Sequence, residues 1–225
     1  MTQMLFRADP YCRETGGTVV DHTPEGGIIL DATVFYPTGG GQPGDSGVLS
    51  WAGQALPIAT TLKGEAEAII LVPAEPQALP PIGARVLQSL DWERRHRHMR
   101  VHTALHLLSV AVAFGVTGGS ISAEGGRLDF NMPDAPDDRE GIEEALNSFV
   151  SDDAVVSEQW MSVEELEANP RLVKTMLVKP PRSAEGVRLI RIGEDVVPID
   201  LQPCGGTHVA RTGEIGQLRL GKIQK

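Results

Sequence analysis

The first part of the chain alternates short apolar runs with turn-forming residues. The runs are rich in Val, Ile and Leu, and glycines and prolines separate them. They lie at residues 18–20, 27–30, 47–49, 68–72 and 85–87. Residues 73–83 contain four prolines and are expected to form a loop. Strands that are this short and this regularly spaced predict a small β-barrel or sandwich.

The pattern changes at Asp91. Residues 91–114 contain no glycine or proline, and Asp91 is expected to cap a helix. The apolar side chains of this segment are separated by four, three and four positions, which is helical periodicity. They are Val101, Leu105, Leu108 and Val112. A long helix is therefore predicted, with the domain boundary just before it, which gives domains 1–91 and 92–225.

The remainder mixes helices with antiparallel strands. Gly118-Gly119 is expected to break the chain, and Ser162 with Glu165 forms a capping box for a short helix that Asn169-Pro170 ends. Strands are expected at 127–131 and 154–161, a helix ending near residue 150, and a hairpin at 187–192 and 196–201. The fold class is predicted as α+β.

Composition excludes several classes of protein. The two cysteines do not suggest a disulfide scaffold, no signal peptide is evident, and the apolar runs are too short to span a bilayer. A cytoplasmic protein with no membrane partner is expected, and a monomer is favoured. The net charge of −10 argues against non-specific coating of nucleic acid, although it permits a local basic face.

Two motifs carry metal-ligand chemistry. His102 and His106 lie one helical turn apart, so their imidazoles can reach one ion. Cys204 and His208 flank a Gly-Gly-Thr segment in which the glycines permit a sharp turn. Three nitrogens and one sulfur suit Zn²⁺. Whether all four bind at once stays open, because a catalytic site usually keeps one position for water or substrate.

The two motifs are also compatible with roles that involve no catalytic metal. A histidine pair alone is more often a surface or packing feature, and a structural zinc site would use the same four residues. A zinc protease is disfavoured because His-Glu-x-x-His is absent, and a deaminase because Pro203-Cys204 is not followed by a second nearby cysteine.

Three separated motifs resemble one family. Residues 91–95 and 99–108 around the histidine pair, and residues 204–216 around Cys204, resemble the editing domain of alanyl-tRNA synthetases and their freestanding relatives, the AlaX proteins. The glycine-rich segment 33–47 matches a third signature of that family. The motifs occur in the family's order and cover nearly the whole chain.

The resemblance implies a fold, a cofactor and an activity. It implies an N-terminal translation-factor-type β-barrel followed by an α/β editing domain of the threonyl- and alanyl-tRNA synthetase type. It places His102, His106, Cys204 and His208 on the family's zinc positions. The expected activity is hydrolysis, in trans, of tRNA(Ala) mischarged with serine or glycine. A second hydrolytic site is needed because a pocket for alanine rejects these amino acids poorly.

Substrate contacts are predicted at the barrel and on the long helix. Thr33 and Gln42, with Gly40 and Gly41 beside them, are candidates for selecting serine, although Thr33 is equally typical of an ordinary strand and the glycines of a simple turn. Arginines of the segment 94–100 are expected to contact the tRNA acceptor end, with Arg94 and Arg100 as the chosen candidates. A second basic stretch lies between residues 171 and 191.

Two other functions remain as alternatives. The chain could be a tRNA-binding module with a structural zinc, which would protect mischarged tRNA without turnover. It could also be a zinc hydrolase of small esters or amides, which would ignore uncharged tRNA(Ala).

Overall fold

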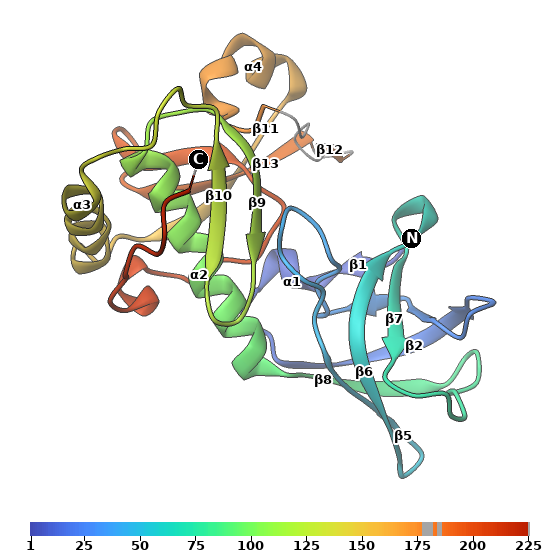
Figure 1. The fold of residues 1–225 in the computed structure, drawn as a ribbon. Coiled ribbons are helices and arrows are strands. Elements are labelled where there is room, and N and C mark those ends of the chain that lie inside the picture. The colour runs from blue at the N-terminus through green and yellow to red at the C-terminus, as the bar shows by residue number, and fades with distance from the viewer. Residues whose placement is uncertain (177–181, 184–185, 225) are drawn as a thin grey trace. The chain divides into compact units, whose positions relative to one another are not determined.

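The chain forms two compact units, Met1–His98 and Met99–Lys225. The computed structural model describes residues 1–176, the backbone of 182–183, and residues 186–224. Figure 1 shows strands dominating the first unit, whereas the second combines helices with strands. The predicted α+β class is confirmed.

The first unit is a closed barrel of six antiparallel strands. Around the barrel the order is β2-β3-β7-β6-β5-β8. The strands are β2 (Glu14–His22), β3 (Ile28–Leu30), β5 (Gly47–Trp51), β6 (Gln54–Lys63), β7 (Ile69–Pro73) and β8 (Arg85–Leu90). Smaller elements are β1 (Gln3–Met4), which pairs in parallel with β4 (Ala32–Thr33), helix α1 (Leu5–Ala8) and the 3-10 turn η1 (Glu65–Glu67). The barrel, and not the sandwich, is therefore the outcome of the sequence pattern.

Alternation along the strands fills the barrel with aliphatic side chains. In β6, Leu56 and Ile58 point inward and are buried, while Pro57 between them is exposed. Leu49 of β5 lies opposite Leu56 and is also fully buried. The sequence pattern missed β6, because a proline inside a short run argues against a strand. Here the proline faces outward and still accepts a hydrogen bond from Ala74 through its carbonyl.

A buried ion pair holds the glycine-rich segment to the barrel unit. The carboxylate of Asp45 accepts hydrogen bonds from the Arg95 guanidinium, whose Nε lies 2.9 Å away, and from the backbone N–H of Tyr36. The same guanidinium donates to the carbonyl oxygens of Val34 and Pro10, at 2.7 and 3.1 Å. Both charged groups are buried, and their pairing offsets the free-energy cost of removing a guanidinium and a carboxylate from water.

The second unit is built on a long helix, a hairpin and a sheet. Helix α2 (Trp92–Ala111) confirms the predicted helix, and its residues from Met99 onward belong to this unit. Strand β13 (Gly186–Gly193) pairs antiparallel with β11 (Val156–Met161), β12 (Arg182–Ser183) and β14 (Pro198–Pro203). The other elements are β9 (Val116–Ile121), β10 (Gly126–Phe130), α3 (Arg139–Ser151), α4 (Val163–Ala168), η2 (Pro170–Leu172) and η3 (Thr212–Ile215).

Local signals for this unit were mostly right. Ser162 accepts from the backbone of Glu165, whose side chain accepts from the backbone of Ser162, so the predicted capping box is present. Helix α4 ends at Ala168, before Asn169-Pro170, as expected. The predicted hairpin is formed by β13 and β14.

One expectation was wrong. Gly118 and Gly119 do not break the chain but lie inside β9, paired with β10. A Cβ on Gly119 would come within 2.9 Å of the Arg127 carbonyl oxygen, and one on Gly118 within 3.0 Å of the Asp129 carboxylate. The glycines are therefore suited to the close approach of the paired strand. The β9–β10 hairpin lies against α2, because a Cβ on Gly126 would meet Val101 at 2.8 Å.

No helix among the described residues is long and apolar enough to cross a membrane.

Candidate metal centre

Helix α2 presents two buried imidazoles from one face. His102 and His106 are each 6% exposed, and their ring centroids lie 5.5 Å apart. Residues one turn apart on a helix have about this separation, so the i, i+4 spacing places both rings side by side on one face of α2.

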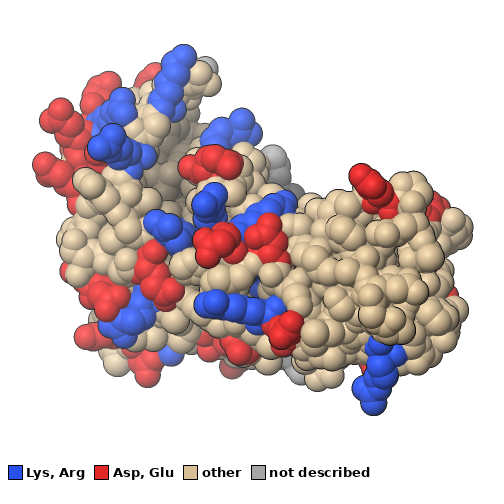
Figure 2. Space-filling model, turned by 90° about the horizontal axis from the view of Figure 1, so that it is seen from below, with Lys and Arg blue, Asp and Glu red and all other residues tan. Residues whose placement is uncertain are grey.

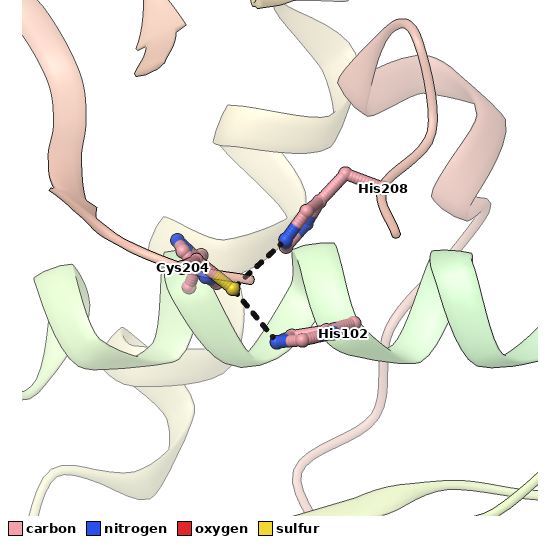
Figure 3. A group of neighbouring side chains, drawn as sticks. His102, Cys204 and His208 are labelled. Carbon is pink, nitrogen blue, oxygen red and sulfur yellow. Dashed lines mark hydrogen bonds between the residues drawn. The ribbon is translucent and has the colours of Figure 1, made fainter. Parts of the chain in front are cut away.

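The loop after β14 brings the other two residues to the helix. The sulfur of Cys204 lies 3.4 Å from Nε2 of His102 and 3.3 Å from Nε2 of His208, as Figure 3 shows. One potential ligand atom from each of the four residues lies within 4.8 Å of all the others. The predicted residues are thus brought together from segments about a hundred positions apart in sequence.

The spacing of these atoms fits a tetrahedral zinc site. Zinc bonds of 2.0–2.3 Å imply edges of about 3.3–3.8 Å between neighbouring ligand atoms. The distances from the Cys204 sulfur to Nε2 of His102 and to Nε2 of His208 fall at that length, and the four potential ligand atoms as a set lie within 4.8 Å of one another. Three imidazoles and one thiolate also form a set that zinc accepts. The geometry and chemistry of the cluster therefore suit a single zinc ion.

Arg188 of β13 fixes the loop that carries Cys204. Its guanidinium is largely buried and donates to the carbonyl oxygens of Cys204 and Gly206, at 3.1 and 3.0 Å. Its backbone carbonyl accepts from the N–H of Cys204, and Glu158 of β11 neutralises its charge at 2.5 Å. The loop is therefore held by β13 through both main chain and side chain.

Thr103 orients the ring of His208. Its hydroxyl donates to the carbonyl oxygen of Met99 at 2.9 Å, the usual bond of a helical threonine to the preceding turn. It therefore accepts from the N–H of Val209 and from Nδ1 of His208, at 3.3 and 3.1 Å. With its hydrogen on Nδ1, His208 directs the lone pair of Nε2 towards Cys204.

Burial and mutual charge shift the protonation of the cluster. Burial opposes ionisation of Cys204, but the neighbouring His102 and His208 hold the pKa of the thiol well below its usual value. Burial and the nearby His102 lower the pKa of His208 to about 3. Burial alone would also lower the pKa of His106, but hydrogen bonds with Asp200 and Cys204 raise it to about 9. A thiolate and a neutral imidazole, the forms that bind metals, are thus favoured at Cys204 and His208.

The barrel residues that the sequence singled out are engaged within their own unit. Thr33 is fully buried in β4, where its hydroxyl donates to the side chain of Gln88 at 2.7 Å and accepts from the N–H of Phe35 at 3.1 Å. Gln42 is also buried, and its backbone pairs with Gly39 across a tight turn. Gly40 and Gly41 form that turn with φ of 58° and 80°, values that favour glycine.

The two candidate arginines also make contacts within the chain. Arg94 donates to the carbonyl oxygen of Gly44 at 2.8 Å, beside the glycine-rich turn. Arg100 donates to the carbonyl oxygen of Ile215 at 3.0 Å through Nε. A contact of either arginine with RNA would have to use its remaining N–H groups.

The second basic stretch is largely neutralised where it is described. Lys174 pairs with Asp200, Arg188 with Glu158, and Arg191 with Asp195. Lys179 lies outside the described residues. Figure 2 likewise shows acidic and basic side chains interspersed on the face that it draws, with no continuous basic stripe.

Sequence reasoning found the four cluster residues but missed those that orient them. Thr103, Arg188 and Asp200 are ordinary residue types for a helix or strand, and only their hydrogen bonds to the cluster reveal them. Their positions in the sequence were the only signal. Thr103 lies between His102 and His106, and Asp200 lies shortly before Cys204.

Comparisons with known families agree with this arrangement. Residues 187–225 match a family described as the threonyl and alanyl tRNA synthetase second additional domain, and residues 13–94 match class II (A) tRNA synthetases. The barrel and the second unit together therefore define a chain of the tRNA synthetase editing-domain class.

Relatives over the whole chain make the assignment more specific. The chain is 35% identical to the alanyl-tRNA editing protein AlaX-M of Saccharolobus solfataricus and 30% identical to that of Methanosarcina acetivorans, and covers 94% of each. It is 34% identical to the alanine–tRNA ligase of Pyrobaculum arsenaticum, of which it spans 25%. The chain belongs to the AlaX family of alanyl-tRNA editing proteins.

Proposed function

We propose that the chain is a zinc-dependent deacylase that removes serine or glycine from mischarged tRNA(Ala) in trans. The observation that carries the proposal is the buried cluster of three histidines and one cysteine in a chain of the AlaX family. In this proposal residues 1–91 are the barrel domain and residues 92–225 the deacylase domain.

The metal would be held by His102, His106, Cys204 and His208. When bound, zinc can polarise a carbonyl, activate water or hold the amino group of the substrate. The protein's own contribution is to hold four ligand side chains, 4–6% exposed in the case of the histidines, at one point. Burial keeps bulk water away, which strengthens electrostatic interactions with an ester carbonyl there.

Selection of serine would use the barrel residues around the glycine-rich turn. The Thr33 hydroxyl donates to Gln88, so it would serve a serine hydroxyl as an acceptor. The substrate would also be contacted by Gln42, Gly40 and Gly41. The glycines lack a side chain and therefore permit close approach of a ligand.

A Thr33→Val variant tests this role. Loss of one hydrogen bond should lower the preference for seryl- over glycyl-tRNA(Ala) about tenfold in kcat/KM. The matched control is Thr61→Val, which removes a buried hydroxyl that donates to the Asp45 carbonyl in the same barrel. Unchanged serine preference in Thr33→Val would leave this threonine a strand residue only.

The function itself is tested by incubating the full chain with tRNA(Ala) charged with serine, glycine or alanine. We expect multiple-turnover release of serine or glycine, slower release of alanine, and inhibition by uncharged tRNA(Ala). Protection of the ester without turnover would indicate a binding module. Hydrolysis of small esters that uncharged tRNA(Ala) does not inhibit would indicate a small-molecule hydrolase.

A further inference from the structure

A buried carboxylate lies behind the metal cluster. Asp200 of β14 has a side chain that is 0% exposed. Its Oδ2 lies 2.9 Å from Nδ1 of His106 and 2.7 Å from Nε2 of Gln202, and its Oδ1 lies 2.6 Å from Nζ of Lys174. Three donors thus compensate the cost of burying this charge.

The same contacts hold His106 from both its ring and its backbone. Lys174 and Gln202 each reach the hydroxyl of Ser109, at 3.2 and 3.1 Å. That hydroxyl donates to the backbone carbonyl of His106 at 2.7 Å. Asp200, Lys174, Gln202 and Ser109 thus form one hydrogen-bond network around His106. This network connects α2 with β14.

The network dictates which ring nitrogen of His106 carries hydrogen. A carboxylate accepts only, so Nδ1 must donate to Asp200. In the neutral ring the lone pair is then on Nε2, the nitrogen left to bind a metal. A carboxylate behind a histidine ligand also raises its basicity and fixes its ring orientation.

We infer that Asp200, held by Lys174 and Gln202, is a positioning residue that fixes the Nδ1–H tautomer of His106 and thereby sets the metal affinity of the cluster. This inference rests on the proposed metal site. Asp200 itself is not a ligand in this arrangement, because its two oxygens are occupied by His106, Gln202 and Lys174.

The first test needs no variant. In the zinc-loaded full chain, the nitrogen and proton NMR signals of the histidine side chains report which ring nitrogen carries hydrogen. We expect a protonated Nδ1 and a metal-bound Nε2 for His106, with a downfield Nδ1–H signal that exchanges slowly. Zinc on Nδ1 of His106 would overturn the inference.

The second test measures zinc affinity by competition with a chromogenic chelator. We expect Asp200→Asn to bind zinc 10–100-fold more weakly than the original chain and to shift or lose the His106 Nδ1–H signal. Lys174→Met retains the carboxylate, so it should keep the signal and lose less affinity. Asp195→Asn is the matched control, because Asp195 is exposed and pairs with Arg191 on the same β13–β14 hairpin, and the zinc affinity of this variant should not change.

The outcomes separate the two proposals. If the original chain binds no zinc, the proposed metal site fails, and this inference fails with it. If the original chain binds zinc and Asp200→Asn binds it equally well with the signal intact, only the role of Asp200 is disproved. If Asp200→Asn does not fold, the tautomer in the original chain and the result for Lys174→Met still decide.

Discussion

At the scale of single residues, hydrogen bonds prepare the cluster before any metal arrives. His208 and His106 each direct Nδ1 to a partner that is not a ligand, Thr103 in one case and Asp200 in the other. Both partners leave Nε2 for the cluster. The orientation of two of the proposed ligands is therefore set by the protein, although His106, whose pKa is raised to about 9, must lose a proton before it can bind a metal.

Replacing Thr103 should weaken the cluster without changing its ligands. Thr103→Val leaves Nδ1 of His208 and the N–H of Val209 without this acceptor, at a cost of about 1–3 kcal/mol. We expect zinc affinity to fall about tenfold. Thr103→Ser keeps the hydroxyl and should bind zinc like the original chain, and equal affinity of the valine variant would contradict the role.

The four residues of the cluster could be predicted from sequence, and the residues that orient them could not. Histidine and cysteine are rare in this chain, and three of the six histidines and one of the two cysteines lie in two short motifs, so their grouping stands out. Threonine, aspartate and arginine are common and serve many purposes. Their role depends on which side chains the fold brings within about 3 Å, and spacing alone does not encode that.

At the scale of elements, the sequence pattern predicted most of the longer strands and helices but missed β6 and β9. Strand β6 was hidden by Pro57, and β9 by Gly118-Gly119. In both cases the partner strand decides the outcome, because Pro57 faces outward and the glycines accommodate β10. Local propensity cannot include a neighbour that is distant in sequence.

The Asp45–Arg95 pair should be a main determinant of barrel stability. Asp45→Asn leaves the buried Arg95 guanidinium without its counter-charge, and breaking such a pair costs about 3–5 kcal/mol. Urea unfolding followed by circular dichroism measures the free energy of unfolding. The control is Asp129→Asn, whose pair with Arg127 is exposed and should contribute about 0–1 kcal/mol. Equal effects of the two variants would contradict the account.

At the scale of the whole molecule, the proposed function requires an acidic chain to bind a polyanion. The net charge is −10, and several basic residues of the second unit are already paired with acids. Binding of tRNA would thus depend on few phosphate contacts, and Arg94 and Arg100 are the proposed ones. The chain covers nearly all of its AlaX-M relatives but only about a quarter of the alanine–tRNA ligases that it matches.

Salt dependence tests the proposed arginine contacts. Arg94→Ala or Arg100→Ala should weaken binding of tRNA(Ala) and reduce the slope of log affinity against log salt by about 1 each. Arg127→Ala is the control, because Arg127 is exposed and paired with Asp129, and its slope should not change. Slopes equal to that of the original chain would remove both arginines from the interface.

The central claim is that three histidines and one cysteine hold a zinc ion on which deacylation depends. Its most direct test is single-turnover hydrolysis of seryl-tRNA(Ala) by the purified chain, before chelation, after removal of metal with a chelator, and after addition of one equivalent of zinc. The account predicts loss of activity on chelation and its return with zinc, in the original chain but not in Cys204→Ala. Full activity of metal-free protein would contradict it.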